Sequence, residues 1–282
     1  MKSTLKMIGL FILIGFSFFY TDKVIEVIRE EDKVMIELTS IEDTYRIEAV
    51  DATIIGNTII PGLNGKVINI DDSYNKMKHL GIFDKNLLIY NDIVPNVSIT
   101  NNKDKFIIKG NNNKQMVSIT FILDNDKYLS DINKILTAKQ VKANYFVTYS
   151  YLINNSTKIK DINHEFYSYG DNGLYSNDNL LFSNNLLTRI KNNNAIYCLA
   201  KNMESSILDI CSKNNLYTIT PSIIGSTNPY NTIKDKLTSG SIILLSMNKE
   251  TINELSTIID YIKGKGLKID TLSNLLNENL NN

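Results

Sequence analysis

Histidine and cysteine are scarce in this sequence, and tryptophan is absent. His79, His164, Cys198 and Cys211 are the only imidazole and thiol groups in a chain of 282 residues. Protein zinc sites are built mainly from such groups, and a catalytic site needs three protein ligands beside an open position for water. The composition therefore leaves little material for a zinc centre.

Net charge is also lacking. Thirty basic residues balance thirty acidic ones, and the basic residues form no stripe along the chain. Nucleic-acid-binding proteins concentrate positive charge on one surface in order to neutralise phosphates. The sequence therefore predicts no nucleic-acid partner.

The two cysteines do not form a redox or metal motif. Cys198 lies in "AIYCLA" and Cys211 in "SILDICSK", and the chain contains no Cys-x-x-Cys pair. An unpaired buried cysteine behaves as a small apolar side chain. This pattern favours two buried thiols, with a disulfide between a strand and the next helix as the open alternative.

The amino-terminal segment is strongly apolar. Lys2 and Lys6 precede a run from Met7 to Tyr20 that carries no charge. The run matches the core of a signal peptide in length, but no small-x-small cleavage site follows it. Snorkelling of Lys6 and an interfacial Phe-Phe-Tyr would lengthen it. We predict an uncleaved signal anchor over 1–22, single-pass in the cell membrane with the body extracytoplasmic; a cleaved export signal is the alternative.

Two regions with different patterns of apolar and polar residues follow this segment. Residues 23–115 predict a small α/β domain, which includes a helix over 32–43 capped by Asp32 and ends in the polar linker 109–115. In residues 116–282, apolar runs such as "MVSITFIL" and "GSIILLSM" alternate with amphipathic segments such as "TINELSTIIDYIKGKG". This alternation predicts a parallel sheet or barrel, whose working face lies at the carboxyl ends of the strands.

The order of these segments resembles the NodB-homology domain of the polysaccharide deacetylases. "KANYFVT" is similar to a strand of that family, "NHEF" to the residues before its second motif, and "GSIILLSMNKETINELSTIIDYIKGKGLKIDTLSNLL" to its last strand, helix and terminal segment. The resemblance covers about 116–276. It implies an α/β fold, a distorted (β/α) barrel, for this region; the small α/β domain and the anchor helix, which precede it, are predicted from the residues themselves.

The catalytic positions of that family are replaced. Its Thr-Phe-Asp-Asp-Gly motif reads "TFILD" here, so the resemblance places Ile122 at the general base and Leu123 at a metal ligand. The family's His-x-x-x-His pair falls on Tyr169 and Gly173, the Arg-Pro-Pro-Tyr motif becomes "YCLAK", and a late histidine becomes Ser246. Leucine and isoleucine offer no lone pair. The resemblance therefore implies no catalytic residue, no metal ligand and no cofactor.

Polar residues after the predicted strands form a candidate glycan-binding rim. Tyrosine rings cover apolar sugar faces while carboxylates and amides bond to hydroxyls. The alternative for the two acids after the first barrel strand is that they cap the next helix and solvate the loop, which is the interpretation the sequence favours for them. The candidate rim residues are Asp124, Asp126, Tyr167, Tyr169, Asp171, Ser246 and Asn248.

Three functional hypotheses follow. The first is a membrane-anchored, extracytoplasmic pseudoenzyme that binds an envelope polysaccharide, peptidoglycan or a wall protein, in wall or spore-coat construction. The second is a divergent carbohydrate deacetylase that cleaves C–N bonds with displaced ligands for zinc or another divalent metal: Asp124, Asp126 and His164. The third is a structural module whose working part is residues 30–115.

Overall fold

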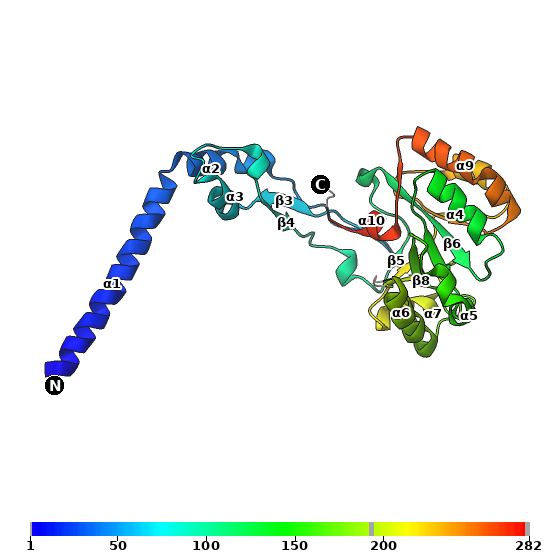
Figure 1. Cartoon of the computed structure of the whole chain (residues 1–282), viewed down its shortest axis with the longest axis horizontal. Coiled ribbons are helices and arrows are strands. Elements are labelled where there is room, and N and C mark those ends of the chain that lie inside the picture. The colour runs from blue at the N-terminus through cyan, green and yellow to red at the C-terminus, as the bar shows by residue number, and fades with distance from the viewer. Residues whose placement is uncertain (1, 192–194, 280–282) are drawn as a thin grey trace. The chain divides into compact units, whose positions relative to one another are not determined.

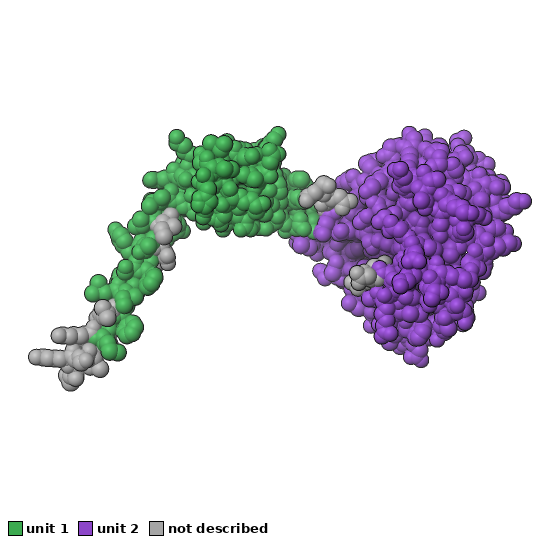
Figure 2. Space-filling model, viewed as in Figure 1, with its two compact units in different colours: residues 1–49, 64–93 green, residues 50–63, 94–282 purple. Residues whose placement is uncertain are grey.

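The computed structural model describes residues 2–191 and 195–279, and these divide into two compact units (Figure 2). Unit 1 contains 1–49 and 64–93, and unit 2 contains 50–63 and 94–282. The predicted boundary at 115/116 differs from this division, because two segments from before that point belong to the barrel unit.

Unit 1 is a small helical unit with one two-stranded sheet. Val34, Leu38, Ile68 and Met77 form its apolar core. The predicted helix over 32–43 is confirmed, since Asp32 accepts a hydrogen bond from the Val34 amide at its start. The elements of unit 1 are α1 (Lys2–Glu30), α2 (Lys33–Tyr45), β3 (Gly65–Ile68), α3 (Ile70–Met77), η1 (Lys85–Leu87) and β4 (Tyr90–Ile93).

The first helix is longer than the predicted anchor. It continues through Glu30, past the end of the 1–22 segment, and includes charged residues of the sequence "TDKVIEVIRE". In the part of the chain that the structure describes, no helix combines the length and apolar character needed to cross a membrane.

Unit 2 is built on two sheets. The first has the order β11-β12-β6-β7-β8, with all neighbouring strands parallel, and β13 pairs with β6 off this path. The second has the order β1-β2-β5-β10-β9. Their strands are β6 (Met116–Leu123), β7 (Asn144–Val147), β8 (Glu165–Ser168), β11 (Ile223–Gly225), β12 (Ile242–Leu245) and β13 (Lys268–Ile269), then β1 (Thr53–Ile55), β2 (Thr58–Ile60), β5 (Phe106–Ile107), β9 (Tyr197–Leu199) and β10 (Tyr217–Ile219).

Helices follow the strands and cover the sheets from outside, as Figure 1 shows for α4 and α9 beside β6. Most of their bounds agree with the sequence patterns to within a few residues, but α5 and the short α10 were not predicted. The helical elements are α4 (Leu129–Ala138), α5 (Tyr149–Ile159), α6 (Asn177–Lys191), α7 (Ser205–Lys213), α8 (Pro229–Lys236), α9 (Lys249–Gly264) and α10 (Leu272–Leu276), with the short turns η2 (Ile99–Asn101) and η3 (Asn112–Lys114).

Of the residues before 116, segments 50–63 and 94–115 join unit 2 through backbone pairing. β5 lies between β2 and β10 and pairs with both in parallel. The predicted polar linker is a packed connection rather than a free one: the Gly110 amide donates to the Gly240 carbonyl at 2.8 Å, and the Lys114 ammonium donates to the Asn274 carbonyl at 2.9 Å. The polar composition of 109–115 therefore indicated a free linker, whereas the segment forms its backbone hydrogen bonds within the fold.

The carboxyl-terminal end is fixed by one buried carboxylate. Glu278 accepts hydrogen bonds from the Gly62 amide at 2.8 Å, from the Ile99 amide at 3.2 Å and from the Ser98 hydroxyl. These donors come from the early segments of unit 2. The contact therefore ties the start and the end of the barrel unit together.

A buried polar network lies at the amino ends of the barrel strands. Asn144 is fully buried and donates to the Ser118 hydroxyl at 2.7 Å and to the Ile119 carbonyl at 2.9 Å. Its own oxygen accepts from the Leu272 amide, the first of α10, at 2.8 Å. One side chain thus joins β7, β6 and α10.

Cys198 and Cys211 form a disulfide in the structure, which joins β9 to α7. The sequence interpretation as two free buried thiols was wrong. Both sulfurs are fully buried in a satellite apolar cluster with Phe106 and Leu180. Burial was predicted correctly, but apolar spacing alone cannot show that two strand and helix positions face each other.

Candidate functional site

A cavity of about 410 Å³ lies at the carboxyl ends of the barrel strands of unit 2. We call it the mouth cavity. In parallel α/β folds this end of the strands is where ligands bind. Its apolar wall includes Ile122, Ile224, Leu244, Leu245 and Met247, and its polar wall consists of Asp124, Asn125, Asn172, Lys201, Ser226 and Ser246.

The polar wall carries one acidic and one basic side chain. Asp124 follows β6 directly and accepts a hydrogen bond from the Asn125 amide group at 2.7 Å. Lys201 follows β9, and its ammonium lies 5.6 Å from the centre of the Tyr169 ring. The ring is 5% exposed, so the lysine covers the aromatic face that the sequence offered as a sugar platform.

The family's general-base and metal positions carry inert groups. Ile122 stands in the cavity wall, and Leu123 is fully buried in the apolar core. Neither side chain can take a proton or bind a metal ion.

The loop at the family's histidine pair has its own backbone shape. Gly173 has a φ of +90°, and a β-carbon built on it would lie 3.0 Å from the Tyr169 hydroxyl. Asp171 belongs to a bridge with Leu174, in which its amide donates to the Leu174 carbonyl at 2.8 Å. The left-handed conformation at 173 favours glycine, so the position is adapted to a turn and not to an imidazole.

The donors at the mouth do not fit a zinc ion. Zinc takes three protein ligands from nitrogen, sulfur and carboxylate groups, whereas the described residues that line the cavity offer the single carboxylate of Asp124 beside amides and hydroxyls. Across residues 2–191 and 195–279, no three histidine, cysteine or acidic side chains cluster closely enough to hold a metal ion.

The predicted rim residues separate into several places. Asp124 and Ser246 line the mouth cavity. Tyr167 is fully buried, and its hydroxyl bonds to Glu165 and to Ser273 of α10, so its prediction as a rim residue was wrong. A (β/α) barrel packs its strands on both faces, which leaves no exposed position within β8.

Asn248 acts as a helix cap. Its side-chain oxygen accepts from the Thr251 amide at 2.8 Å at the start of α9, and its amide group donates to the Ser226 carbonyl at 3.0 Å. Asn248 therefore holds the loop that carries Ser246, without lining the cavity itself.

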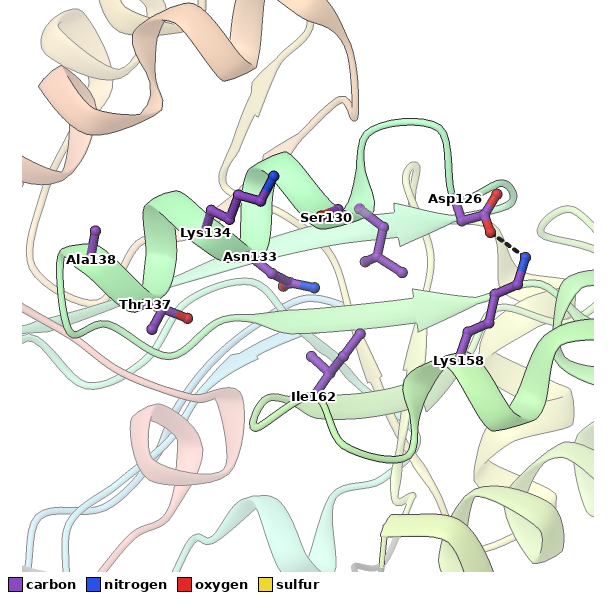
Figure 3. A pocket seen from close by; sticks show the side chains of 9 residues that line it. Asp126, Ser130, Asn133, Lys134, Thr137, Ala138, Lys158 and Ile162 are labelled. Atoms are coloured by element: carbon purple, nitrogen blue, oxygen red, sulfur yellow. Dashed lines mark hydrogen bonds and ion pairs between the residues drawn. The ribbon is translucent and has the colours of Figure 1, made fainter.

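Asp126 lies in a different cavity, a groove of about 700 Å³ between α4 and the segment around 158–162 (Figure 3). It forms an ion pair with Lys158, which comes from α5. Figure 3 shows the two side chains pointing toward each other at one end of this groove. The structure thus supplies the partner that the sequence could not show, and Asp126 is not a rim residue of the mouth.

The displaced ligand set of the divergent hydrolase is not brought together. His164 precedes Glu165, which pairs in register with Asn144 and through it with Thr120. Asp124 lies at the other end of these parallel strands. Along the strand direction, the backbone of Asp124 is about 16 Å from the level of His164, at roughly 3.3 Å per residue. The donor atoms that bind one metal ion lie within about 4 Å of one another. His164 and Asp124 therefore cannot bind the same ion.

His164 has a structural role at the amino end of the barrel. Its Nδ1 accepts a hydrogen bond from the Ala143 amide at 3.3 Å, and its ring packs on Tyr145. Burial, together with the positive charges of Lys191 and Lys142, lowers the pKa of His164 to about 4. The folded protein therefore holds this imidazole neutral.

This pKa predicts a loss of stability in acid. A histidine whose folded pKa lies below its unfolded value binds the proton more tightly when unfolded, so its contribution is complete above about pH 6.5 and falls as the pH drops toward 4. Between pH 7 and 4.5 we expect His164 to account for about 2 kcal/mol of lost unfolding free energy. Urea unfolding of the parent and of His164→Gln at both pH values measures it. His79→Gln, at an exposed position of unit 1, is the control. Equal pH dependence in parent and His164→Gln would contradict the expectation.

Four polar residues of the mouth were not among the sequence candidates: Asn125, Asn172, Lys201 and Ser226. Lys201 ends "YCLAK", the segment that replaces the family's arginine motif, and this was the available signal. Asn125, Asn172 and Ser226 follow no recognisable sequence spacing. They come together only because the ends of separate strands meet in the folded chain.

Comparison with known proteins identifies the fold. No family profile matches the chain. The chain has the CE4 fold, that of the NodB-like polysaccharide deacetylases. It superposes on wild-type BA3943, described as a CE4 family pseudoenzyme from Bacillus anthracis, with a TM-score of 0.66 and 24% identity, covering 88% of this chain and 96% of that one. PdaA of Bacillus subtilis, a family 4 carbohydrate esterase, gives a TM-score of 0.52 and 16% identity over 60% of this chain and 84% of PdaA.

The chain is also similar in sequence to YlxY of Bacillus subtilis, an uncharacterized protein. The two are 26% identical over 245 residues, which is 78% of this chain and 75% of YlxY. The α/β fold that the resemblance implies is confirmed by the structural superposition. The predicted anchor helix is not supported, since no membrane-spanning helix is found among the described residues.

Proposed function

We propose that this protein is a non-catalytic member of the CE4 fold that binds an envelope glycan at its mouth cavity. One observation carries the proposal. The cavity has a volume of about 410 Å³ and a polar wall that includes Asp124, Lys201 and Ser246, while the base and metal positions hold Ile122 and Leu123. A pocket of this size lined by an apolar wall and a few polar groups suits a small polar ligand such as a sugar unit.

The similarity to BA3943 supports the non-catalytic part of the proposal, because that protein is described as a pseudoenzyme. The chemistry agrees. Hydrolysis of an acetamide in this fold requires a metal ion to lower the pKa of a water molecule and to polarise the acyl oxygen, and the donors present do not fit one.

We place the protein outside the cytoplasmic membrane. The disulfide between Cys198 and Cys211 supports this placement, because such bonds persist in oxidising compartments. The helix α1 and its apolar start would serve as the tether that the sequence analysis predicts.

An acetate-release assay tests the absence of catalysis. The full chain, incubated with acetylated chitin and peptidoglycan fragments with and without added zinc, is expected to release no acetate above a protein-free blank, while it binds at least one of these glycans in a titration. Zinc-dependent acetate release, abolished by Asp124→Ala in a folded variant, would overturn the proposal.

A protein partner is the second candidate, and exposed apolar side chains favour it. Leu174 is 75% exposed and Met203 is 55% exposed, and each lies two residues from a residue of the cavity wall, Asn172 and Lys201 respectively. The protein-partner candidate takes precedence if the titration detects no glycan binding. It is ruled out if the variant with serine at both positions still binds glycan and the parent captures no protein.

A further inference from the structure

We propose that the mouth cavity selects a sugar unit that carries both a protonated amine and a carboxylate. This inference rests on the proposed glycan-binding function and specifies its ligand. It is drawn from the two charges of the cavity wall, Asp124 and Lys201, which come from the loops after β6 and β9.

The two charges do not neutralise each other. Both side chains line the same cavity, yet among the described residues neither takes part in an ion pair. Asp124 is bonded to the amide group of Asn125, and Lys201 lies over the Tyr169 ring. A carboxylate and an ammonium held apart in one cavity match a ligand that bears the opposite charges, also held apart.

The rest of the lining suits the uncharged part of a sugar. Asn172 and Ser246 offer an amide and a hydroxyl for ring hydroxyls, and Ile224 and Met247 offer apolar surface for ring carbons. An aromatic platform is missing, because Tyr167 and Tyr169 are buried. A neutral sugar would therefore gain little from stacking, and it would cover two charges without pairing them.

Discrimination against neutral sugars follows from this geometry. A bound ligand that removes water from Asp124 and Lys201 must replace the lost hydrogen bonds, and a charged group left unpaired costs more than a neutral one. N-acetylation removes the amine charge, so an acetylated unit leaves Asp124 without a cation. The proposed preference is thus the reverse of that expected for a deacetylase substrate.

Four monosaccharides test the inference directly. Muramic acid carries an amine and a carboxylate, glucosamine only the amine, N-acetylmuramic acid only the carboxylate, and N-acetylglucosamine neither. We expect the full chain, titrated at low salt with protein resonances observed by NMR, to bind muramic acid with a Kd at least tenfold below that of each of the other three. Added salt should reduce the difference, since both charges contact solvent.

Two substitutions assign the charges separately. Asp124→Asn should remove the preference for sugars with a free amine and leave the preference for a carboxylate. Lys201→Gln should do the opposite. Asp126→Asn and Lys127→Gln remove the same charges from the loop after β6 at positions that do not line the cavity, and they should leave all four affinities unchanged.

The outcomes separate this inference from the function on which it rests. Equal affinity for all four sugars, or an unchanged ranking in Asp124→Asn and Lys201→Gln, overturns the charge-pair inference while glycan binding stands. If none of the four sugars and no N-acetylglucosamine tetramer binds, the proposed function fails as well.

Discussion

Replacement of Asn144 by alanine is expected to lower the free energy of unfolding by about 4 kcal/mol, since each buried group left without a partner costs about 1–3 kcal/mol. Asn144 is fully buried and serves three groups at once: the Ser118 hydroxyl, the Ile119 carbonyl and the Leu272 amide. Alanine would leave the last two without their side-chain partner and would open a small cavity between β6, β7 and α10.

Chemical denaturation followed by far-UV circular dichroism measures this loss. Asn144→Asp keeps the acceptor for the Leu272 amide but loses both donors and buries a carboxylate, so at neutral pH it should be at least as destabilising as alanine. Asn125→Ala removes the same side chain at an exposed position and should change stability by less than about 0.5 kcal/mol. A loss below about 1 kcal/mol in Asn144→Ala would show that the network does not hold α10 as the structure indicates.

Removal of the Cys198–Cys211 disulfide is expected to cost about 3 kcal/mol. The bond closes a loop of the size for which chain-entropy arguments give roughly this value. The loop runs from β9 through α7, and α7 packs against β10 with Cys211 in the buried cluster. Without the bond, the unfolded chain regains freedom while the folded packing changes little.

A double Cys198→Ala, Cys211→Ala variant, compared with the parent under oxidising and reducing conditions, checks this expectation. The variant should match the reduced parent within about 1 kcal/mol, and its stability should not respond to reductant. A thiol titration of the unreduced parent, carried out after denaturation, is the decisive control. Two reactive thiols after denaturation without reductant would show that the bond is absent.

The barrel itself could be predicted from the sequence because its signals are local. The strand predicted as "MVSITFIL" is β6 (Met116–Leu123), in which every residue but Ile122 is fully buried or nearly so. The long amphipathic run after β12 gave α9 (Lys249–Gly264) nearly residue for residue. In both cases the hydrophobic period alone determines which element forms.

Other features depended on contacts that no local pattern shows. Helix α5 (Tyr149–Ile159) contains an Asn-Asn-Ser-Thr stretch with non-helical dihedrals at Asn155, so its pattern resembled a loop. Lys158 comes from this unpredicted helix, so its ion pair with Asp126 could not be predicted from the sequence.

The site was predictable only where a residue directly follows a strand. Asp124 follows β6 and Ser246 follows β12, and both reach the cavity. Tyr167 lies inside β8, where every residue after the partly exposed Glu165 is buried. Lys201 required knowledge of how the end of β9 approaches the end of β6, which is set by the tertiary fold.

The turn at Gly173 limits what a single substitution could introduce at this loop. Its φ of +90° penalises every side chain, and the bridge between Asp171 and Leu174 depends on the same backbone path. A codon change to histidine at this position would first destabilise the loop before it could contribute a ligand. A metal ligand at this position would therefore require a change of backbone conformation as well as a change of side chain.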